Sequence, residues 1–219
     1  MPTISHGLAI FDLDFTLLEG DIEAMWAKFL FDQGLVGEDF LQRMRAYYVD
    51  YDQGHLDIYD YEAYLLRPLI KLSMSELQHL QGEFLKRVRM ALRPKMLRQM
   101  DRHRAGGHTL LLITAANDFL ADPVAELLGF DHRICTNIKR SAGQITTELE
   151  GIPSIGAGKA ARLRQWLSET GHNLTESWGY GDSHNDIPLL SLLKHPVAVK
   201  PDPILEAHAR QHGWKIITL

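Results

Sequence analysis

The sequence predicts an α/β fold, in which a parallel β-sheet carries helices on both faces and a small helical domain is inserted after the first strand. Two observations support this prediction. From about residue 92 onward, short apolar runs alternate with segments of helical periodicity, which is typical of parallel strands joined by crossover helices. Between about residues 20 and 91, helical periodicity occurs without strand-like runs.

The first strand is expected at Leu8–Phe11, where four consecutive apolar residues indicate a buried strand. We divide the chain into a core of residues 1–19 and 92–219 and a helical insert of residues 20–91. Gly20 and Gly34 supply flexible backbone where the insert would leave the core and turn. Apolar residues recur at helical spacing within the insert, namely Met25, Trp26, Phe29 and Leu30, then Phe40, Leu41 and Met44, then Leu77, Leu80, Phe84, Leu85 and Val88.

The elements expected after residue 92 alternate along the chain. Helices are expected near 94–105, 118–128, 158–169 and 185–193, and strands near 109–114, 133–136, 176–180, 197–199 and 214–217. A turn signal at Ser141-Ala142-Gly143 predicts a small β excursion within residues 139–150.

Composition narrows the class of protein. The chain has 219 residues, 45% of them hydrophobic, and a net charge of -5, so it lacks the basic excess of a nucleic-acid-binding protein. We interpret Cys135, the single cysteine, as a buried apolar residue rather than a nucleophile. Residues 1–6 do not resemble a signal peptide, and no apolar run approaches the ~20 residues of a membrane span. We therefore expect a soluble cytoplasmic protein without a membrane partner.

Two acidic clusters follow predicted strands. Asp12 and Asp14 come directly after the first strand, at the edge where open α/β sheets bind their ligands. Asp182 and Asp186 follow Gly181, and their spacing of four places them on one face of a helical turn. Neighbouring carboxylates repel each other unless a cation or a proton relieves them. The two clusters therefore predict the oxygen ligands of one Mg²⁺ ion.

Two further residues suit a phosphoryl group. Thr114 ends the expected strand at 109–114, and Lys159 lies in the first turn of the expected helix at 158–169. A hydroxyl, an ammonium group and a metal ion are the groups that bind phosphoryl oxygens. Taken alone, Thr114 would be interpreted as an ordinary strand-end residue and Lys159 as a solvated helix residue, so their functional interpretation depends on the aspartates. We interpret His184 as an exposed loop residue rather than a metal ligand, because no second histidine or cysteine lies at ligand spacing.

Taken together, these motifs resemble the haloacid dehalogenase superfamily of phosphohydrolases. The motif DxDxT at residues 12–16 is followed by an apolar strand ending in Thr114, then by Lys159, then by GDxxxD at 181–186. Four motifs in this order are more specific than any one of them. The resemblance implies a Rossmann-like core, and an insert placed after the first motif is similar to the cap of the subgroup containing phosphoserine phosphatase.

The resemblance also implies roles for these residues in a Mg²⁺-dependent phosphatase. Asp12 would be the nucleophile that forms an aspartyl phosphate, and Asp14 would protonate the leaving alcohol and then activate water. Thr114 and Lys159 would hold the phosphoryl oxygens. The Mg²⁺ ligands would be Asp12, the main-chain carbonyl of Asp14, and Asp182, with Asp186 orienting this set.

The insert is expected to choose the substrate, a small phosphorylated metabolite. Residues 46–66 lack lysine and arginine but interleave five acids with six tyrosines, which is either a lining for a cationic group or a solvated face. Asp21, nine residues after Asp12, lies where phosphoserine phosphatases have a glutamate that contacts the substrate amine. Asn117 is expected at the pocket edge, hydrogen-bonded to substrate.

Three departures set the chain apart from phosphoserine phosphatases. Phe15 stands where that group has serine, Ala115-Ala116-Asn117 stands where it has glycines, and the residues inside the last acidic motif follow a different pattern. Some relatives in the subgroup act on histidinol phosphate, so the expected substrate is an amine-bearing alcohol phosphate of the histidinol phosphate or phosphoserine type. Phosphotransfer to a second alcohol, or a non-catalytic binding module on the same fold, are the alternatives. The oligomeric state is not predicted.

Overall fold

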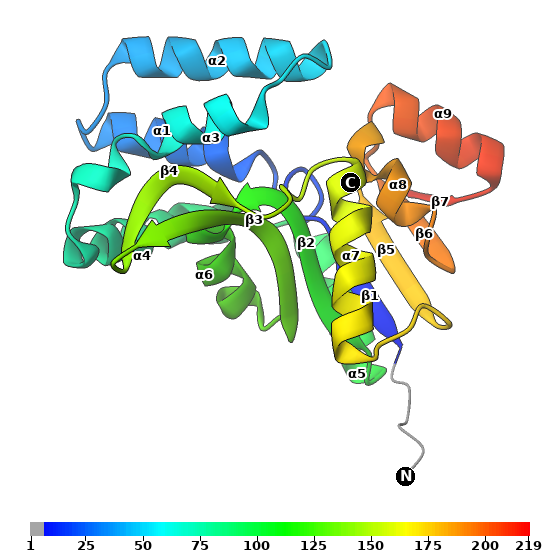
Figure 1. Cartoon of the computed structure of the whole chain (residues 1–219). Helices are drawn as coiled ribbons and strands as arrows, with labels where there is room; N and C mark the ends of the chain where they lie inside the picture. Colours follow the sequence, from blue (N-terminus) through cyan, green and yellow to red (C-terminus); the bar gives the residue numbers. More distant parts are fainter. Residues whose placement is uncertain (1–6) are drawn as a thin grey trace.

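The computed structural model describes residues 7–219 and contains one seven-stranded sheet in the order β4-β3-β2-β1-β5-β6-β7 (Figure 1). Every neighbouring pair is parallel except the antiparallel pair of β3 and β4. The strands are β1 (Leu8–Phe11), β2 (Thr109–Asn117), β3 (His132–Ser141), β4 (Gln144–Glu150), β5 (Ser177–Gly181), β6 (His195–Val199) and β7 (Lys215–Ile217). Residues 1–6, on which the signal-peptide expectation rests, lie outside the described part.

Helices pack on both faces of the sheet, which confirms the predicted α/β class. The helices α5 (Pro94–Ala105) and α6 (Asp118–Leu128) pack on one face, and α7 (Ala157–Thr170), α8 (Ile187–Leu190) and α9 (Pro203–His212) on the other. Alternate residues of β1 enter the two resulting cores: Ala9 and Phe11 belong to the first, and Leu8 and Ile10 to the second. Burial on both faces explains why this strand is apolar throughout.

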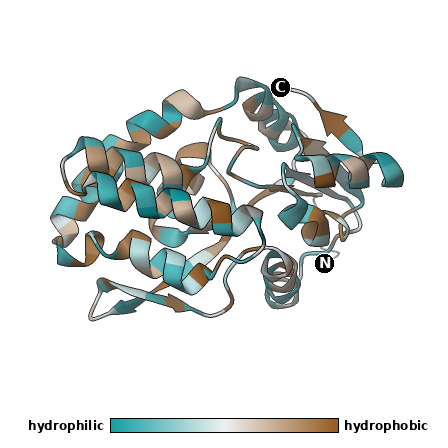
Figure 2. Cartoon of the chain, turned by 90° about the horizontal axis from the view of Figure 1, so that it is seen from above, coloured by the Kyte–Doolittle hydropathy of each residue, from teal (hydrophilic) through white to brown (hydrophobic). Residues whose placement is uncertain are grey.

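The four helices between β1 and α5 lie over one end of the sheet (Figure 1). They are α1 (Ile22–Asp32), α2 (Glu38–Asp52), α3 (Ile58–Leu66) and α4 (Met74–Ala91), with a 3-10 turn, η1, at Leu69–Lys71. Figure 2 shows brown and teal residues alternating along these helices, as in amphipathic helices that bury one stripe. Trp26 of α1 packs its ring against Phe84 of α4 and Phe119 of α6, so the core of the insert is continuous with that of the sheet.

The chain leaves the sheet and returns to it at one point. Leu18 and Leu92 form an isolated antiparallel bridge, and the guanidinium of the buried Arg93 donates to the Leu18 carbonyl at 2.9 Å. The bridge brings the two ends of the insert together. The boundaries at residues 20 and 91 themselves stay a prediction.

Three elements differ from the sequence expectation. The strand expected at 133–136 continues to Ser141 and forms a hairpin with β4, so the β excursion belongs to the main sheet, and α3 packs on it. The helix expected at 185–193 is reduced to a 3-10 turn, η2 (His184–Asp186), and the short α8. Helix α9 was not expected, although Asp202 caps its amino end and Pro203 occupies its first turn, both recognisable start signals.

Two observations bear on the composition-based expectations. Cys135 is buried, and burial together with the charges of Asp122 and Asp118 raises the pKa of its thiol to about 12, so the thiol stays protonated and unreactive. Among the described residues, no helix is both long and apolar enough to span a bilayer.

Candidate active site

The sheet order places the predicted site residues together. Because β1 lies between β2 and β5, the carboxyl ends of these three strands are adjacent. Asp12 follows β1, Thr114 lies near the end of β2, and Asp182 follows β5. Between β1 and β5 the chain order along the sheet reverses, and such a switch point is where open α/β sheets bind ligands.

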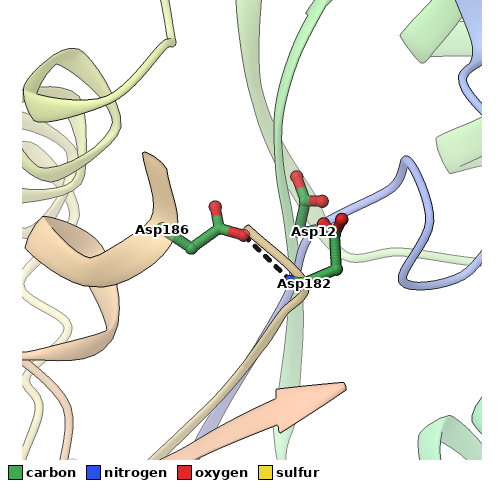
Figure 3. A group of neighbouring side chains, drawn as sticks. All are labelled: Asp12, Asp182 and Asp186. Atoms are coloured by element: carbon green, nitrogen blue, oxygen red, sulfur yellow. Dashed lines mark hydrogen bonds between the residues drawn. The ribbon is translucent and has the colours of Figure 1, made fainter. Parts of the chain in front are cut away.

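Three carboxylates converge at this edge. Asp12, Asp182 and Asp186 each place an oxygen within 4.8 Å of the others (Figure 3). In Figure 3 the side chains of Asp12 and Asp182 lie side by side, while Asp186 approaches from η2. Asp12 and Asp186 are 4% and 1% exposed, so these charges are largely removed from water.

The local sequence explains how Asp186 is fixed. Its Oδ2 accepts a hydrogen bond from the Asp182 amide at 3.1 Å, and Ser183 and Asp186 form a reciprocal capping box around η2. A Cβ at Gly181 would lie 2.4 Å from that Oδ2. Glycine is therefore required for the close approach of the Asp186 carboxylate to the backbone.

Lys159 joins the two acidic clusters. It is 5% exposed, and its ammonium group donates to Asp12 Oδ1 at 2.6 Å and to Asp186 Oδ1 at 2.7 Å. Although burial lowers the pKa of Lys159, the two carboxylates raise it further, so the ammonium group stays charged. One cation held between two buried carboxylates is an arrangement that a solvated helix lysine would not adopt.

The remaining charge suits a divalent cation. Burial, partly offset by Lys159, raises the pKa of Asp12 to about 6, and burial together with Asp12 and Asp186 raises the pKa of Asp182 to about 9. Lys159 carries one positive charge beside the carboxylates of Asp12, Asp182 and Asp186, so it does not balance them alone. An all-oxygen donor set at the wall of a cavity fits Mg²⁺, which binds through one or two carboxylates and substrate oxygens.

Asp14 lies in the loop between β1 and the insert. Its Oδ1 accepts from the Ile22 amide at 2.6 Å, and its main-chain oxygen accepts from Thr16 at 2.5 Å while keeping a second lone pair. Burial, then the charges of Asp21 and Asp12, raise the pKa of Asp14 well above its usual range. The next residue, Phe15, has a φ of 49°, which is a strained value for an aromatic residue, and lies 48% exposed at the cavity.

A cavity of about 360 Å³ extends from this centre to the insert. Its carboxylates come from Asp12, Asp14, Asp21, Glu23, Asp182 and Asp202, and its aromatic rings from Phe15, Tyr47, Tyr48, Tyr51 and Tyr61. Among the described residues that line it, Lys159 is the single lysine or arginine, and its ammonium group is already bound to Asp12 and Asp186. The end of the cavity at the insert is therefore acidic and aromatic.

Two predicted substrate contacts do not reach the cavity. Thr114 is fully buried, and its hydroxyl accepts from the Ala116 amide at 3.1 Å. The prediction for Asn117 is corrected. β2 continues to this residue through a register shift, and Asn117 is 1% exposed, caps α6 by accepting from Leu120, and donates its amide to Glu23 and Glu62.

Asp21 and Glu23 are the acids that the insert contributes to the cavity. Asp21 caps α1 and accepts from Tyr48 at 2.8 Å. Glu23, which sequence reasoning missed, is 7% exposed and accepts from Tyr61 at 2.8 Å. A detectable signal existed, because Glu23 lies on the same buried stripe of α1 as Trp26 and Ala27.

The tyrosine-rich stretch at residues 46–66 was expected either to line the cavity or to form a solvated face, and its residues do both. Tyr48, Tyr51 and Tyr61 line the cavity, whereas Asp57 and Asp60 are exposed. His184 is not the exposed loop residue that was expected. It is partly buried at the cavity wall, where its Nδ1 lies 2.8 Å from Asp202 Oδ2.

The fold and the site define a class of α/β protein in which buried carboxylates and one lysine meet at the switch point of a parallel sheet, beneath a helical insert. The model of the haloacid dehalogenase-like hydrolases matches residues 9–191, and the chain belongs to this family.

Similar proteins agree with this class. A histidinol-phosphatase of Neisseria meningitidis is 37% identical over 96% of this chain and 97% of its own length. A phosphoserine phosphatase of Mycobacterium tuberculosis is 38% identical, but over only 52% of this chain and 37% of its own length.

Solved structures show the same fold. A protein of unknown function from Bordetella pertussis has a TM-score of 0.89 at 36% identity, covering 97% of this chain and 98% of that protein. A substrate-bound phosphoserine phosphatase has a TM-score of 0.71 at 18% identity, covering 98% and 94% of the two chains.

Proposed function

We propose that this hydrolase is a Mg²⁺-dependent phosphatase that cleaves a small phosphate monoester through an aspartyl phosphate on Asp12. The observation that carries the proposal is the position of the Asp12 carboxylate. It is buried, bound to the Lys159 ammonium group at 2.6 Å, and open to the cavity. A carboxylate held in this way is oriented for attack on phosphorus, a known use of aspartate in covalent catalysis.

The other residues have complementary roles in this mechanism. Mg²⁺, when bound by Asp12, Asp182 and the Asp14 main-chain oxygen with Asp186 behind them, supplies charge neutralisation for the phosphoryl group. Lys159 binds phosphoryl oxygens from the Asp186 side. Thr114 does not line the cavity, and its proposed role is to donate its hydroxyl hydrogen, which the contact with the Ala116 amide leaves free, once a phosphoryl group is bound. Asp14 lines the same cavity, from which it gives a proton to the leaving alcohol and takes one from the water that follows.

The charge of the cavity limits the substrate. A zwitterion such as phosphoserine needs a cation for its carboxylate, and the single lysine or arginine among the described lining residues is Lys159 at the phosphoryl end. Asp21, Glu23 and the ring faces of Tyr48 and Tyr61 instead favour a positively charged leaving group. We therefore favour an amine-bearing alcohol phosphate without a carboxylate, of the histidinol phosphate type. The name of the Neisseria relative supports this choice.

Phosphate release from histidinol phosphate, phosphoserine and 4-nitrophenyl phosphate, each with Mg²⁺ and with a chelator, tests the proposal. We expect Mg²⁺-dependent release from all three and the highest kcat/KM for histidinol phosphate. A higher kcat/KM for phosphoserine would overturn the substrate assignment, and release that is unaffected by chelation would overturn the metal. Transfer of phosphate to an added alcohol in place of release would identify a phosphotransferase.

A further inference from the structure

Three buried polar side chains meet where the insert joins the sheet. Glu23 comes from α1, Glu62 from α3 and Asn117 from the end of β2, and they are 7%, 0% and 1% exposed. The Asn117 side-chain amide donates to Glu23 Oε1 at 3.1 Å and to Glu62 Oε2 at 3.0 Å. The Asn117 main-chain amide also donates to Glu23 Oε1, at 3.2 Å. Asn117 is therefore hydrogen-bonded to two carboxyl groups from two helices of the insert.

The two carboxyl groups have no balancing cation in hydrogen-bonding contact among the described residues. The Oε1 atom of Glu62 is buried and has no hydrogen-bond partner in the described part of the chain. The titratable groups facing the pair are all acids or phenols, namely Asp14, Asp21, Tyr48, Tyr61 and Asp118. Burial raises the pKa of Glu62 to about 7 and that of Glu23 well above its usual range. Adjacent buried carboxyl groups in such surroundings hold a proton between them.

Only one of the two carboxyl groups lines the cavity. Glu23 lines the cavity, whereas Glu62 and Asn117 lie behind it and do not. The Tyr61 hydroxyl donates to Glu23 Oε2 at 2.8 Å, so both oxygens of Glu23 are held from the protein side. Asp21, the other acid of the insert in the cavity, already accepts from the Ala24 amide and the Tyr48 hydroxyl on a single oxygen, Oδ1.

Resting on the phosphatase function proposed above, we propose that Glu23 is the specificity-determining residue that binds the ammonium group of the substrate, and that Glu62 and Asn117 are positioning residues that hold it. The two carboxyl groups share one proton before substrate binds, and an ammonium group beside Glu23 moves that proton onto Glu62, so that Glu23 presents a carboxylate to the substrate. Asn117 fixes the orientation of that carboxylate through two donors. A buried carboxylate without a cation then gains its counter-ion only when the substrate enters.

The substitution Glu23→Gln tests the binding role, because it removes the charge and keeps the shape. We expect KM for histidinol phosphate to rise about 10- to 100-fold, the range for losing a hydrogen bond to a charged group. We expect kcat/KM for 4-nitrophenyl phosphate, which carries no amine, to change less than about threefold. Asp50→Asn is a matched control, since Asp50 belongs to the insert but does not line the cavity. Equal losses on the two substrates would overturn the proposal.

Two substitutions of Glu62 distinguish a positioning role from a role in packing alone. Glu62→Gln mimics a protonated carboxyl group and should leave both substrates within about threefold of the unmodified enzyme. Glu62→Leu removes the partner of Asn117 and should raise KM for histidinol phosphate while sparing 4-nitrophenyl phosphate. If Glu62→Gln and Glu62→Leu were equally impaired, Glu62 would not act as a neutral support.

A binding measurement keeps the inference separate from the proposed reaction. Calorimetric titration of histidinol phosphate into the Asp12→Asn protein requires no turnover, and adding Glu23→Gln should weaken binding about 10- to 100-fold. Unchanged affinity would contradict the role of Glu23 even if the enzyme is a phosphatase. Absence of phosphate release from every ester, with the loss of affinity observed, would instead contradict the reaction.

Discussion

Removal of the Asp182 carboxylate is expected to stabilise the metal-free protein at neutral and alkaline pH and to abolish its response to Mg²⁺. In the folded protein the pKa of Asp12 is raised from 3.8 to about 6 and that of Asp182 from 3.8 to about 9. A carboxyl group whose folded pKa is raised stabilises the fold fully below its unfolded pKa, and this stabilisation is lost as pH rises through the folded value. The metal-free protein should therefore lose stability from about pH 4 upward.

The magnitude follows from Asp12, which is 4% exposed. Its raised pKa corresponds to about 3 kcal/mol lost between pH 4 and neutrality, at about 1.4 kcal/mol per pKa unit. In a chain of 219 residues this is a fall of about 6–12 °C in Tm. Mg²⁺ binds the ionised carboxylates of the folded state, so a Mg²⁺ concentration 100 times Kd should restore about 2.7 kcal/mol of stability. At one fixed Mg²⁺ concentration, this stabilisation should increase as pH rises, because more of the carboxyl groups are ionised.

Thermal unfolding between about pH 4 and about pH 8, with a chelator or with Mg²⁺, measures both effects. Asp182→Asn should show a flatter pH dependence and a higher Tm than the unmodified protein in chelator at pH 8, with little change on adding Mg²⁺. Asp50→Asn, which removes a charge outside the cavity, should behave as the unmodified protein does. Stability of the metal-free protein that rises over this pH range, or an Asp182→Asn variant that keeps the Mg²⁺ response, would refute the reasoning.

Two further substitutions test the internal contacts of the site. Lys159→Met leaves Asp12 and Asp186 buried without their cation, so urea unfolding in chelator should show a loss of about 3–5 kcal/mol, and a loss under about 1 kcal/mol would contradict the contact. Gly181→Ala places a Cβ 2.4 Å from Asp186 Oδ2 and should weaken Mg²⁺ activation about 10- to 100-fold, measured by titrating Mg²⁺ in the phosphate-release assay. Gly82→Ala is its control, because a Cβ there meets nothing within 4 Å in α4, and equal behaviour of the two variants would exclude the steric explanation.

The sequence predicted the α/β sheet and the residues that now surround its switch point. These predictions rest on short-range signals: an apolar strand followed by acids, and a glycine after a second apolar run followed by two acids spaced four apart. Asp12, Asp182, Asp186 and Lys159 meet because adjacent parallel strands end at one edge. Their catalytic roles remain proposals.

The surroundings of Asn117 and Glu23 could not be predicted from the sequence, because they depend on contacts between segments that are far apart along the chain. Asn117 was expected to face substrate, but β2 continues through a register shift and turns its amide toward two glutamates of the insert. Glu23 was missed because an acid in the first turn of a helix is usually explained by the helix dipole. Its role depends on Glu62, which lies 39 residues further along the chain. No local pattern reports such a pairing.

The central claim, that Asp12 is the nucleophile of a phosphatase, is tested most directly by trapping the enzyme during turnover. Rapid acid quenching with excess substrate and Mg²⁺, followed by peptide mass spectrometry, should find phosphate on the peptide that contains Asp12. Asp12→Asn should show neither the phosphopeptide nor phosphate release. A phosphate-free Asp12 peptide in a protein that is turning over, together with an Asp12→Asn variant that retains phosphate release, would contradict the account.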